Sequence, residues 1–174
     1  KFLRANAARF GGDPDRIAVI GGSAGGYLSM MAGYAPDVPE FQEGDPKVSA
    51  RIQAVVDLYG PTDLTVPLAR INPTVTNFIG KSYEEAPQTY ALASPMTHVD
   101  KDDPPTLIIQ GTLDNIVWPS QSDALAEKFK ALGMDYWYDR IDGWPHTLDI
   151  AYVNFEHTSA LIREFLKARG LGVA

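Results

Sequence analysis

Four short and largely apolar runs divide the chain, and each has the length of a β-strand. They occupy residues 17–20, 52–58, 106–110 and 136–141. Apolar runs of this length, bounded by glycine and proline, are typical of strands that are buried on both faces of a sheet. We therefore predict four strands.

Amphipathic stretches lie between these runs and predict helices. They cover residues 27–35, the segment from Pro119 to Gly133, and residues 150–168. Proline is favoured in the first helical turn, and glycine commonly ends a helix. The alternation of strands and helices predicts the α/β class, with a mostly parallel sheet and helices on both faces. On the last helix we expect the buried side to carry Ile150, Val153, Leu161 and Phe165.

One internal segment departs from the alternation. Residues 61–98 contain several prolines, scattered aromatic residues and only weak periodicity. We expect them to leave the sheet, and they are a candidate cap over a pocket.

The first residues have the pattern of a helix interior. Leu3, Ala7 and Phe10 recur with helical spacing, Gly11 then ends the pattern, and no initiator Met precedes it. We expect residues 1–174 to form the C-terminal portion of a single, larger domain whose remaining strands lie upstream.

Composition narrows the possible partners. The formal net charge is −7 and the chain contains no Cys. An acidic protein is a poor ligand for nucleic acid and for anionic membranes, and no apolar run has the length of a membrane-spanning helix. The absence of Cys excludes disulfides, thiolate catalysis and Cys-ligated metals. We therefore expect no nucleic-acid and no membrane partner.

A G-x-S-x-G motif lies between the first predicted strand and the following helix. Its residues are Gly21-Gly22-Ser23-Ala24-Gly25. A strand–turn–helix context is what this motif requires, because a sharp turn must project the serine hydroxyl from the end of the sheet. We expect the glycines to prevent Cβ collisions or to supply positive φ angles. The alternative is a glycine-rich turn with an inert serine.

A serine hydroxyl is a weak nucleophile, so the motif predicts a histidine base and an orienting acid. Asp114 follows the third predicted strand and His146 follows the fourth, in the chain order Ser, Asp, His. The carboxyl ends of parallel strands meet at one edge of the sheet, where ligands bind in α/β folds. The backbone N–H of Ala24, at the start of a helix, is the expected oxyanion donor.

The acid and the histidine base each have alternative candidates in the sequence. Asp63 follows the second predicted strand and is an alternative acid, whereas Asp142 is too close to His146 in sequence. His98 precedes the third strand, at the wrong end of the sheet. His157 falls on the expected apolar stripe of the last helix, where a packed structural role is the simpler interpretation.

Other residues carry weaker signals. Trp144 lies two residues before His146 and either forms a wall of the substrate pocket or anchors its loop by burial. Trp118 and Tyr27 are expected to pack the ends of the sheet. The acidic run at residues 100–103 lacks the spacing of a calcium loop. No phosphate loop or His/carboxylate cluster is present, so we expect no cofactor and no metal.

Several segments together resemble α/β-hydrolase esterases, especially the acetyl-esterase/lipase group. They occur in the order that this family uses, at residues 16–26, 59–64, 94–95, 104–114 and 142–146. The similarity extends to bacterial acetyl-xylan and feruloyl esterases. The resemblance implies that Ser23, Asp114 and His146 form a triad, and that a second oxyanion donor and about four more strands lie upstream of this sequence.

The resemblance also implies a reaction. We expect a serine esterase that removes acetyl or feruloyl-type groups from small-molecule or oligosaccharide esters through an acyl-enzyme. A serine exopeptidase of the same fold and a non-catalytic binding protein that kept the fold are the alternatives.

Overall fold

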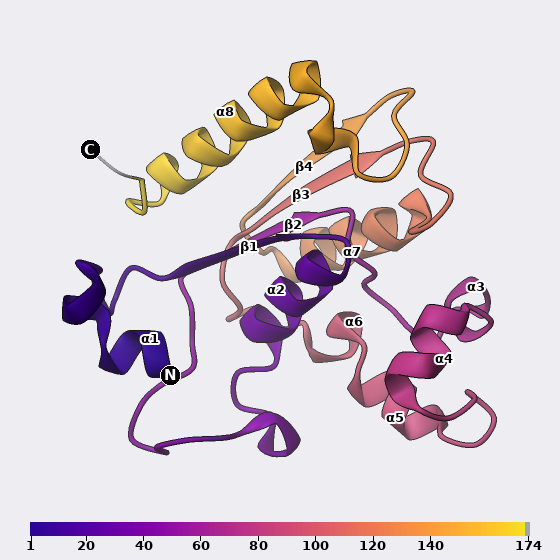
Figure 1. The fold of residues 1–174 in the computed structure, drawn as a ribbon, viewed down its shortest axis with the longest axis horizontal. Coiled ribbons are helices and arrows are strands. Elements are labelled where there is room, and N and C mark those ends of the chain that lie inside the picture. Colours follow the sequence, from indigo (N-terminus) through magenta and orange to yellow (C-terminus); the bar gives the residue numbers. More distant parts are fainter. Residues whose placement is uncertain (173–174) are drawn as a thin grey trace.

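The computed structural model, which describes residues 1–172, is built on a four-stranded sheet (Figure 1). The strands are β1 (Ala18–Gly22), β2 (Ala54–Leu58), β3 (Thr106–Gly111) and β4 (Tyr136–Ile141). They lie in the order β1-β2-β3-β4, and every neighbouring pair is parallel. This confirms the predicted parallel sheet. Both β2 and β3 are buried along their full length, which explains why their sequences are largely apolar.

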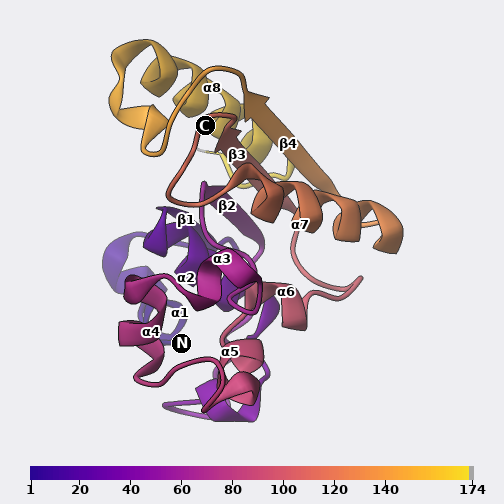
Figure 2. The same ribbon diagram turned by 90° about the vertical axis from the view of Figure 1, so that its right-hand side faces the viewer.

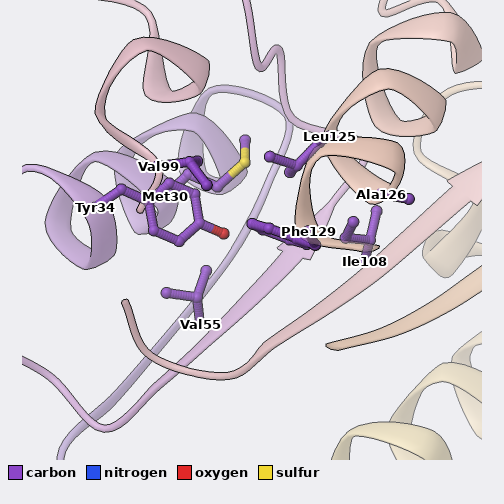
Figure 3. Close-up of a cluster of buried hydrophobic side chains, with 8 residues drawn as sticks. All are labelled: Met30, Tyr34, Val55, Val99, Ile108, Leu125, Ala126 and Phe129. Carbon is purple, nitrogen blue, oxygen red and sulfur yellow. The ribbon is translucent and has the colours of Figure 1, made fainter. Parts of the chain in front are cut away.

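Helices cover both faces of the sheet (Figures 1 and 2). Helices α2 (Ala24–Tyr34) and α7 (Pro119–Leu132) lie on one face, and α8 (Tyr152–Ala168) lies on the other. Alternate strand residues point to opposite faces, so two separate clusters form. Val55 and Ile108 pack with α2 and α7 (Figure 3), whereas Val56 and Leu107 pack with Phe165 of α8.

The segment at residues 61–98 leaves the sheet, as the sequence predicts. It forms four short helices: α3 (Pro67–Arg70), α4 (Pro73–Ile79), α5 (Pro87–Leu92) and α6 (Pro95–His98). Each helix begins with a proline, whose fixed φ angle and missing N–H suit the first helical position. Residues of α4 and α5 pack in a small cluster that contains Leu64 and Tyr90, whereas Met96 of α6 packs against the cluster beneath α2.

The first ten residues differ from the prediction. They form α1 (Phe2–Ala5) and a 3₁₀ helix (Ala7–Phe10), which are separated at Asn6. The side-chain amide of Asn6 donates to the carbonyl of Phe2, a local bond of the kind that competes with helix continuation. Leu3 and Phe10 are exposed, and Ala7 is the one member of the expected apolar stripe that is buried in the described residues. A second 3₁₀ turn, Pro39–Phe41, lies in the loop after α2.

The last helix begins later and is rotated relative to the prediction. A 3₁₀ turn (Leu148–Ile150) precedes α8. Ile150 and Val153 are 79% and 61% exposed, so their assignment to the buried side was wrong. The side of α8 that faces the sheet carries Asn154, Thr158 and Phe165, with Leu161 partly buried against the same cluster, so the placement of Leu161 and Phe165 is confirmed.

Candidate active site

Ser23 lies at the turn between β1 and α2 and has an unusual backbone conformation. Its φ and ψ angles are 55° and −119°, and it is one of three non-glycine residues with positive φ in the described chain. Such a conformation costs roughly 1–3 kcal/mol and persists only where the surroundings impose it. Here the N–H of Ser23 donates to the carbonyl of Leu58 at 2.8 Å, which ties the turn to β2.

Gly21 and Gly26, on either side of Ser23, are needed for space and not for positive φ. A Cβ on Gly21 would lie 2.3 Å from the backbone of Gly25, and one on Gly26 would lie 2.2 Å from Oδ1 of Asp57. A Cβ on Gly25 would meet nothing within 4 Å. The expectation that both flanking glycines avoid collisions therefore holds at Gly21 and is wrong at Gly25. The positive φ angle belongs to the serine itself.

The structure brings His146 and Asp114 to Ser23. Nε2 of His146 lies 2.9 Å from Oγ of Ser23, and Nδ1 lies 2.6 Å from Oδ2 of Asp114. A carboxylate at Nδ1 selects the tautomer in which Nδ1 carries the proton, so Nε2 is left to accept the serine proton. The three side chains come from the carboxyl ends of β1, β3 and β4, at one edge of the sheet.

Asp114 is held rigidly for this contact. Asp114 is only 2% exposed, and its Oδ1 accepts hydrogen bonds from the backbone N–H groups of Ile116 and Val117, both at 2.9 Å. Oδ2 accepts from the side-chain amide of Gln110 at 3.1 Å in addition to His146. These bonds fix the plane of the carboxylate, and the carboxylate in turn fixes the imidazole.

The rival residues lie elsewhere. Oδ1 of Asp63 accepts from the N–H and hydroxyl of Thr65, and Asp142 accepts from Thr112 at 3.0 Å. Nε2 of His98 lies 2.6 Å from the carbonyl of Leu92 in the segment off the sheet. None of these contacts involves the triad.

His157 was predicted to be a packed residue on an apolar stripe, and this is wrong. It is exposed, and its Nε2 lies 2.6 Å from Oδ2 of Asp139 on the surface. The rotation of α8 described above is the reason, because it turns this side of the helix to solvent.

Ala24 is the first residue of α2, directly after Ser23. The first N–H groups of a helix have no intrahelical acceptor and lie at the positive end of the helix dipole. The backbone N–H of Ala24 is therefore free to donate to an oxyanion that develops beside Oγ of Ser23.

A cavity of about 150 Å³ opens beside Ser23. Its walls come from the turn at Ser23, from α3 and α4, and from the loop between Asp114 and α7. Among residues 1–172, those that line it are uncharged. The apolar part is formed by Pro61, Val66, Leu68, Ala69, Val75, Ile116, Val117 and Trp118. A larger cavity of about 640 Å³ follows β1 and α2 but does not contain any triad residue.

Trp144 and Trp118 differ in whether they line the cavity beside Ser23. Trp144 packs against the cluster between the sheet and α8, and its carbonyl accepts from the N–H of Leu113 at 2.9 Å. It does not line the cavity beside Ser23, so its contacts favour the alternative role of a loop anchor. Trp118, expected to pack the sheet end, is 46% exposed and forms part of the cavity wall.

An ionisable group that the sequence analysis did not single out lies beneath the serine turn. Asp57 of β2 is fully buried, and its Oδ1 accepts from the N–H of Gly60 at 2.8 Å, while Oδ2 has no partner. Burial raises the pKa of Asp57 to about 8, although the bond from Gly60 opposes the shift. A carboxylate inside an otherwise apolar strand was the available signal.

Within residues 1–172, no group of three or more His, Asp or Glu side chains is arranged to hold a metal ion. None of the helices described is both long and apolar enough to cross a bilayer.

The chain matches the BD-FAE family model over residues 1–129. It is 31% identical to the probable carboxylic ester hydrolase LipM of Mycobacterium tuberculosis over 172 residues, which are 95% of this chain and 40% of that protein.

Solved esterases have the same fold. The propionate-bound esterase Est2 of Thermogutta terrifontis superposes with a TM-score of 0.82 at 27% identity, over 99% of this chain and 63% of that one. A truncated carbohydrate esterase from gut microbiota gives 0.79 at 29% identity, over 94% and 64%. The chain thus spans less than two thirds of each of these relatives. It belongs to the BD-FAE family, a family of α/β-hydrolase esterases.

Proposed function

We propose that the protein is a serine esterase that hydrolyses carboxylic esters through an acyl-enzyme. The observation that carries this proposal is the continuous chain of contacts from Ser23 through His146 to Asp114, with distances of 2.9 and 2.6 Å. Distances of this size permit proton transfer from the hydroxyl to the imidazole as the hydroxyl attacks.

The reaction follows from these contacts. His146 takes the proton of Ser23 while Oγ attacks the acyl carbon, and Asp114 stabilises the resulting imidazolium. The backbone N–H of Ala24 donates to the oxyanion. The tetrahedral intermediate then collapses, and His146 returns the proton to the departing alcohol. Water, activated by the same imidazole, attacks the acyl-enzyme and releases the acid and Ser23.

The substrate proposed is a small, neutral acyl group, such as acetyl, esterified to a carbohydrate. The cavity beside Ser23 has about half the volume of the smallest pockets that hold drug-sized ligands, roughly 300 Å³, and its lining is uncharged. A structural neighbour described as a carbohydrate esterase supports a sugar as the alcohol. Of the two acyl groups expected from the resemblance, acetyl is the smaller and is therefore the one we propose for this cavity.

We also propose that an upstream part of the same domain completes the site. β1 pairs only with β2 among the described residues, and Ile20 and Leu28 beside the open edge are 49% and 60% exposed. The cavity of about 640 Å³ along β1 and α2 adds a large apolar surface there. Added strands would cover this surface and supply the second oxyanion donor.

A substrate panel and an active-site label test the proposal in the full-length protein. We expect hydrolysis of p-nitrophenyl acetate and acetylated xylo-oligosaccharides, slower hydrolysis of methyl ferulate, and no cleavage of aminoacyl anilides. A fluorophosphonate should modify Ser23. The Ser23→Ala variant should lose labelling and turnover, whereas Ser120→Ala, which removes another serine of the same cavity, should keep the labelling. Faster cleavage of amides than of esters would favour the exopeptidase, and an unlabelled Ser23 would favour a binding protein.

A further inference from the structure

Tyr59 is the residue directly after β2, and its backbone is strained. Its φ angle is 46°, which a tyrosine rarely adopts, and the residue is only 4% exposed. The N–H of Tyr59 donates to the carbonyl of Ile109 at 2.8 Å, so the main chain is tied to β3 at this point. Strain of this kind points to surroundings that hold the side chain in one place.

The side chain of Tyr59 lies between the serine turn and the histidine loop. Its ring centroid is 4.7 Å from that of His146, with an edge-to-face angle of 64° between the planes. A Cβ on Gly22 would lie 2.8 Å from the Tyr59 hydroxyl oxygen. The ring therefore fills the space next to the residue that precedes Ser23 and, at the same time, supports the imidazole.

The hydroxyl of Tyr59 holds the other side of the histidine loop. It donates to Oδ1 of Asp149, three residues after His146, in the 3₁₀ turn that leads into α8. Burial and the adjacent carboxylate of Asp149 raise the pKa of Tyr59, so the hydroxyl keeps its proton and stays a donor. Leu148 of the same turn is 2% exposed and packs in the same cluster as Tyr59.

We infer that Tyr59 is a positioning residue that, through its bond to Asp149 and its ring contact with His146, holds the imidazole against Ser23. The inference rests on the proposed esterase function. Tyr59 touches no reacting atom of the ester. Its role is to restrict the histidine loop, whose residue Thr147 also has a positive φ angle of 57°.

The size of the effect can be bounded from the contact. A hydrogen bond to a charged group, once lost, changes an equilibrium about tenfold to a hundredfold, and a displacement of the base by about 1 Å costs about a hundredfold in rate. Because the ring contact remains when only the hydroxyl is removed, we expect about a tenfold loss.

The test uses matched variants of the full-length protein with an acetyl ester as substrate. In Tyr59→Phe and in Asp149→Ala, kcat should fall about tenfold while KM stays within about twofold. Asp149→Asn keeps an acceptor oxygen and should recover most of the kcat that Asp149→Ala loses. The double variant Tyr59→Phe/Asp149→Ala should be no slower than either single variant, because both remove one bond.

Tyr138→Phe is the control, since the Tyr138 hydroxyl donates to Asp123 at 2.7 Å in a comparable pair away from the triad. Its kcat should not change. An unchanged kcat in soluble Tyr59→Phe, or a raised KM at constant kcat, would overturn the inference while leaving the esterase proposal intact. A wild-type protein with no esterase activity would refute both the inference about Tyr59 and the esterase proposal. If Tyr59→Phe does not fold, the comparison of Asp149→Ala with Asp149→Asn decides, and equal kcat values would refute the inference.

Discussion

Asp57 should give the stability of the protein a pH dependence that one substitution removes. The carboxyl group is completely buried beneath the serine turn, and its one hydrogen bond comes from the N–H of Gly60. In the Asp57→Asn variant the amide oxygen can still accept that bond, and the side chain keeps its shape. The variant therefore imitates the protonated carboxyl group at every pH.

The sign of the effect follows from the raised pKa. The pKa of Asp57 moves from 3.8 to about 8 on folding, so the folded protein holds this proton more tightly than the unfolded chain does. The penalty for ionisation is absent below about pH 4, grows as the pH rises, and is complete above about pH 8. Between pH 5 and pH 8 the free energy of unfolding of the wild type should fall by about 3 to 4 kcal/mol relative to Asp57→Asn.

Urea unfolding at pH 5, 6, 7 and 8 measures this difference. Other ionisable groups contribute equally to both proteins and cancel. Asp102→Asn is the matched control, because the Asp102 side chain is 72% exposed and its removal should give a difference that is independent of pH. If the stabilities of wild type and Asp57→Asn change in parallel with pH, Asp57 is not the buried, proton-holding group described above, and the reasoning fails.

Other predictions concern the triad and the turn. Asp114→Asn should lower kcat on the order of 10⁴-fold, whereas Asp63→Asn should change kcat less than about threefold. Steady-state kinetics measure both variants, and a lower kcat in Asp63→Asn than in Asp114→Asn would reverse the assignment of the acid. Gly26→Ala should destabilise the protein by about 1–3 kcal/mol, because the added Cβ would lie 2.2 Å from Oδ1 of the buried Asp57. Gly25→Ala is the control and should be neutral or stabilise the protein by up to about 1 kcal/mol, because its Cβ would meet nothing within 4 Å. Thermal unfolding compares the two, and equal melting temperatures would contradict the space argument.

The contacts among Ser23, His146 and Asp114 were predictable because their sequence signals are local and the sheet is parallel. The turn at Ser23 is marked by adjacent glycines, and Asp114 and His146 each follow the end of a strand. Parallel strands place all their carboxyl ends on one edge, so three residues far apart in sequence were expected there. The choice between Asp114 and Asp63 was not local, since both follow strands; only the 2.6 Å contact with Nδ1 distinguishes them.

The surroundings of individual side chains were harder to predict from the sequence. Trp118 and Trp144 are both near chain segments that lead to the site, but only Trp118 lines the cavity. Tyr59 is ordinary by its sequence context, and Asp57 is marked only as a carboxylate within an apolar run. The pKa of each is raised mainly by burial among other segments. A pattern of residue types along one segment contains no information about these partners.

By itself, the sequence determined the alternation of strands and helices, the class of the sheet and the position of the nucleophile turn, because each depends on periodicity or on glycine and proline over a few residues. The tertiary structure alone decided the rotation of α8, which exposes Val153 and buries Asn154. It also decided which glycine of the turn is sterically required. The physical reason is the same in both cases: the direction in which a side chain points is set by long-range packing against residues distant in the chain, and that packing forms only when the layers of the fold assemble.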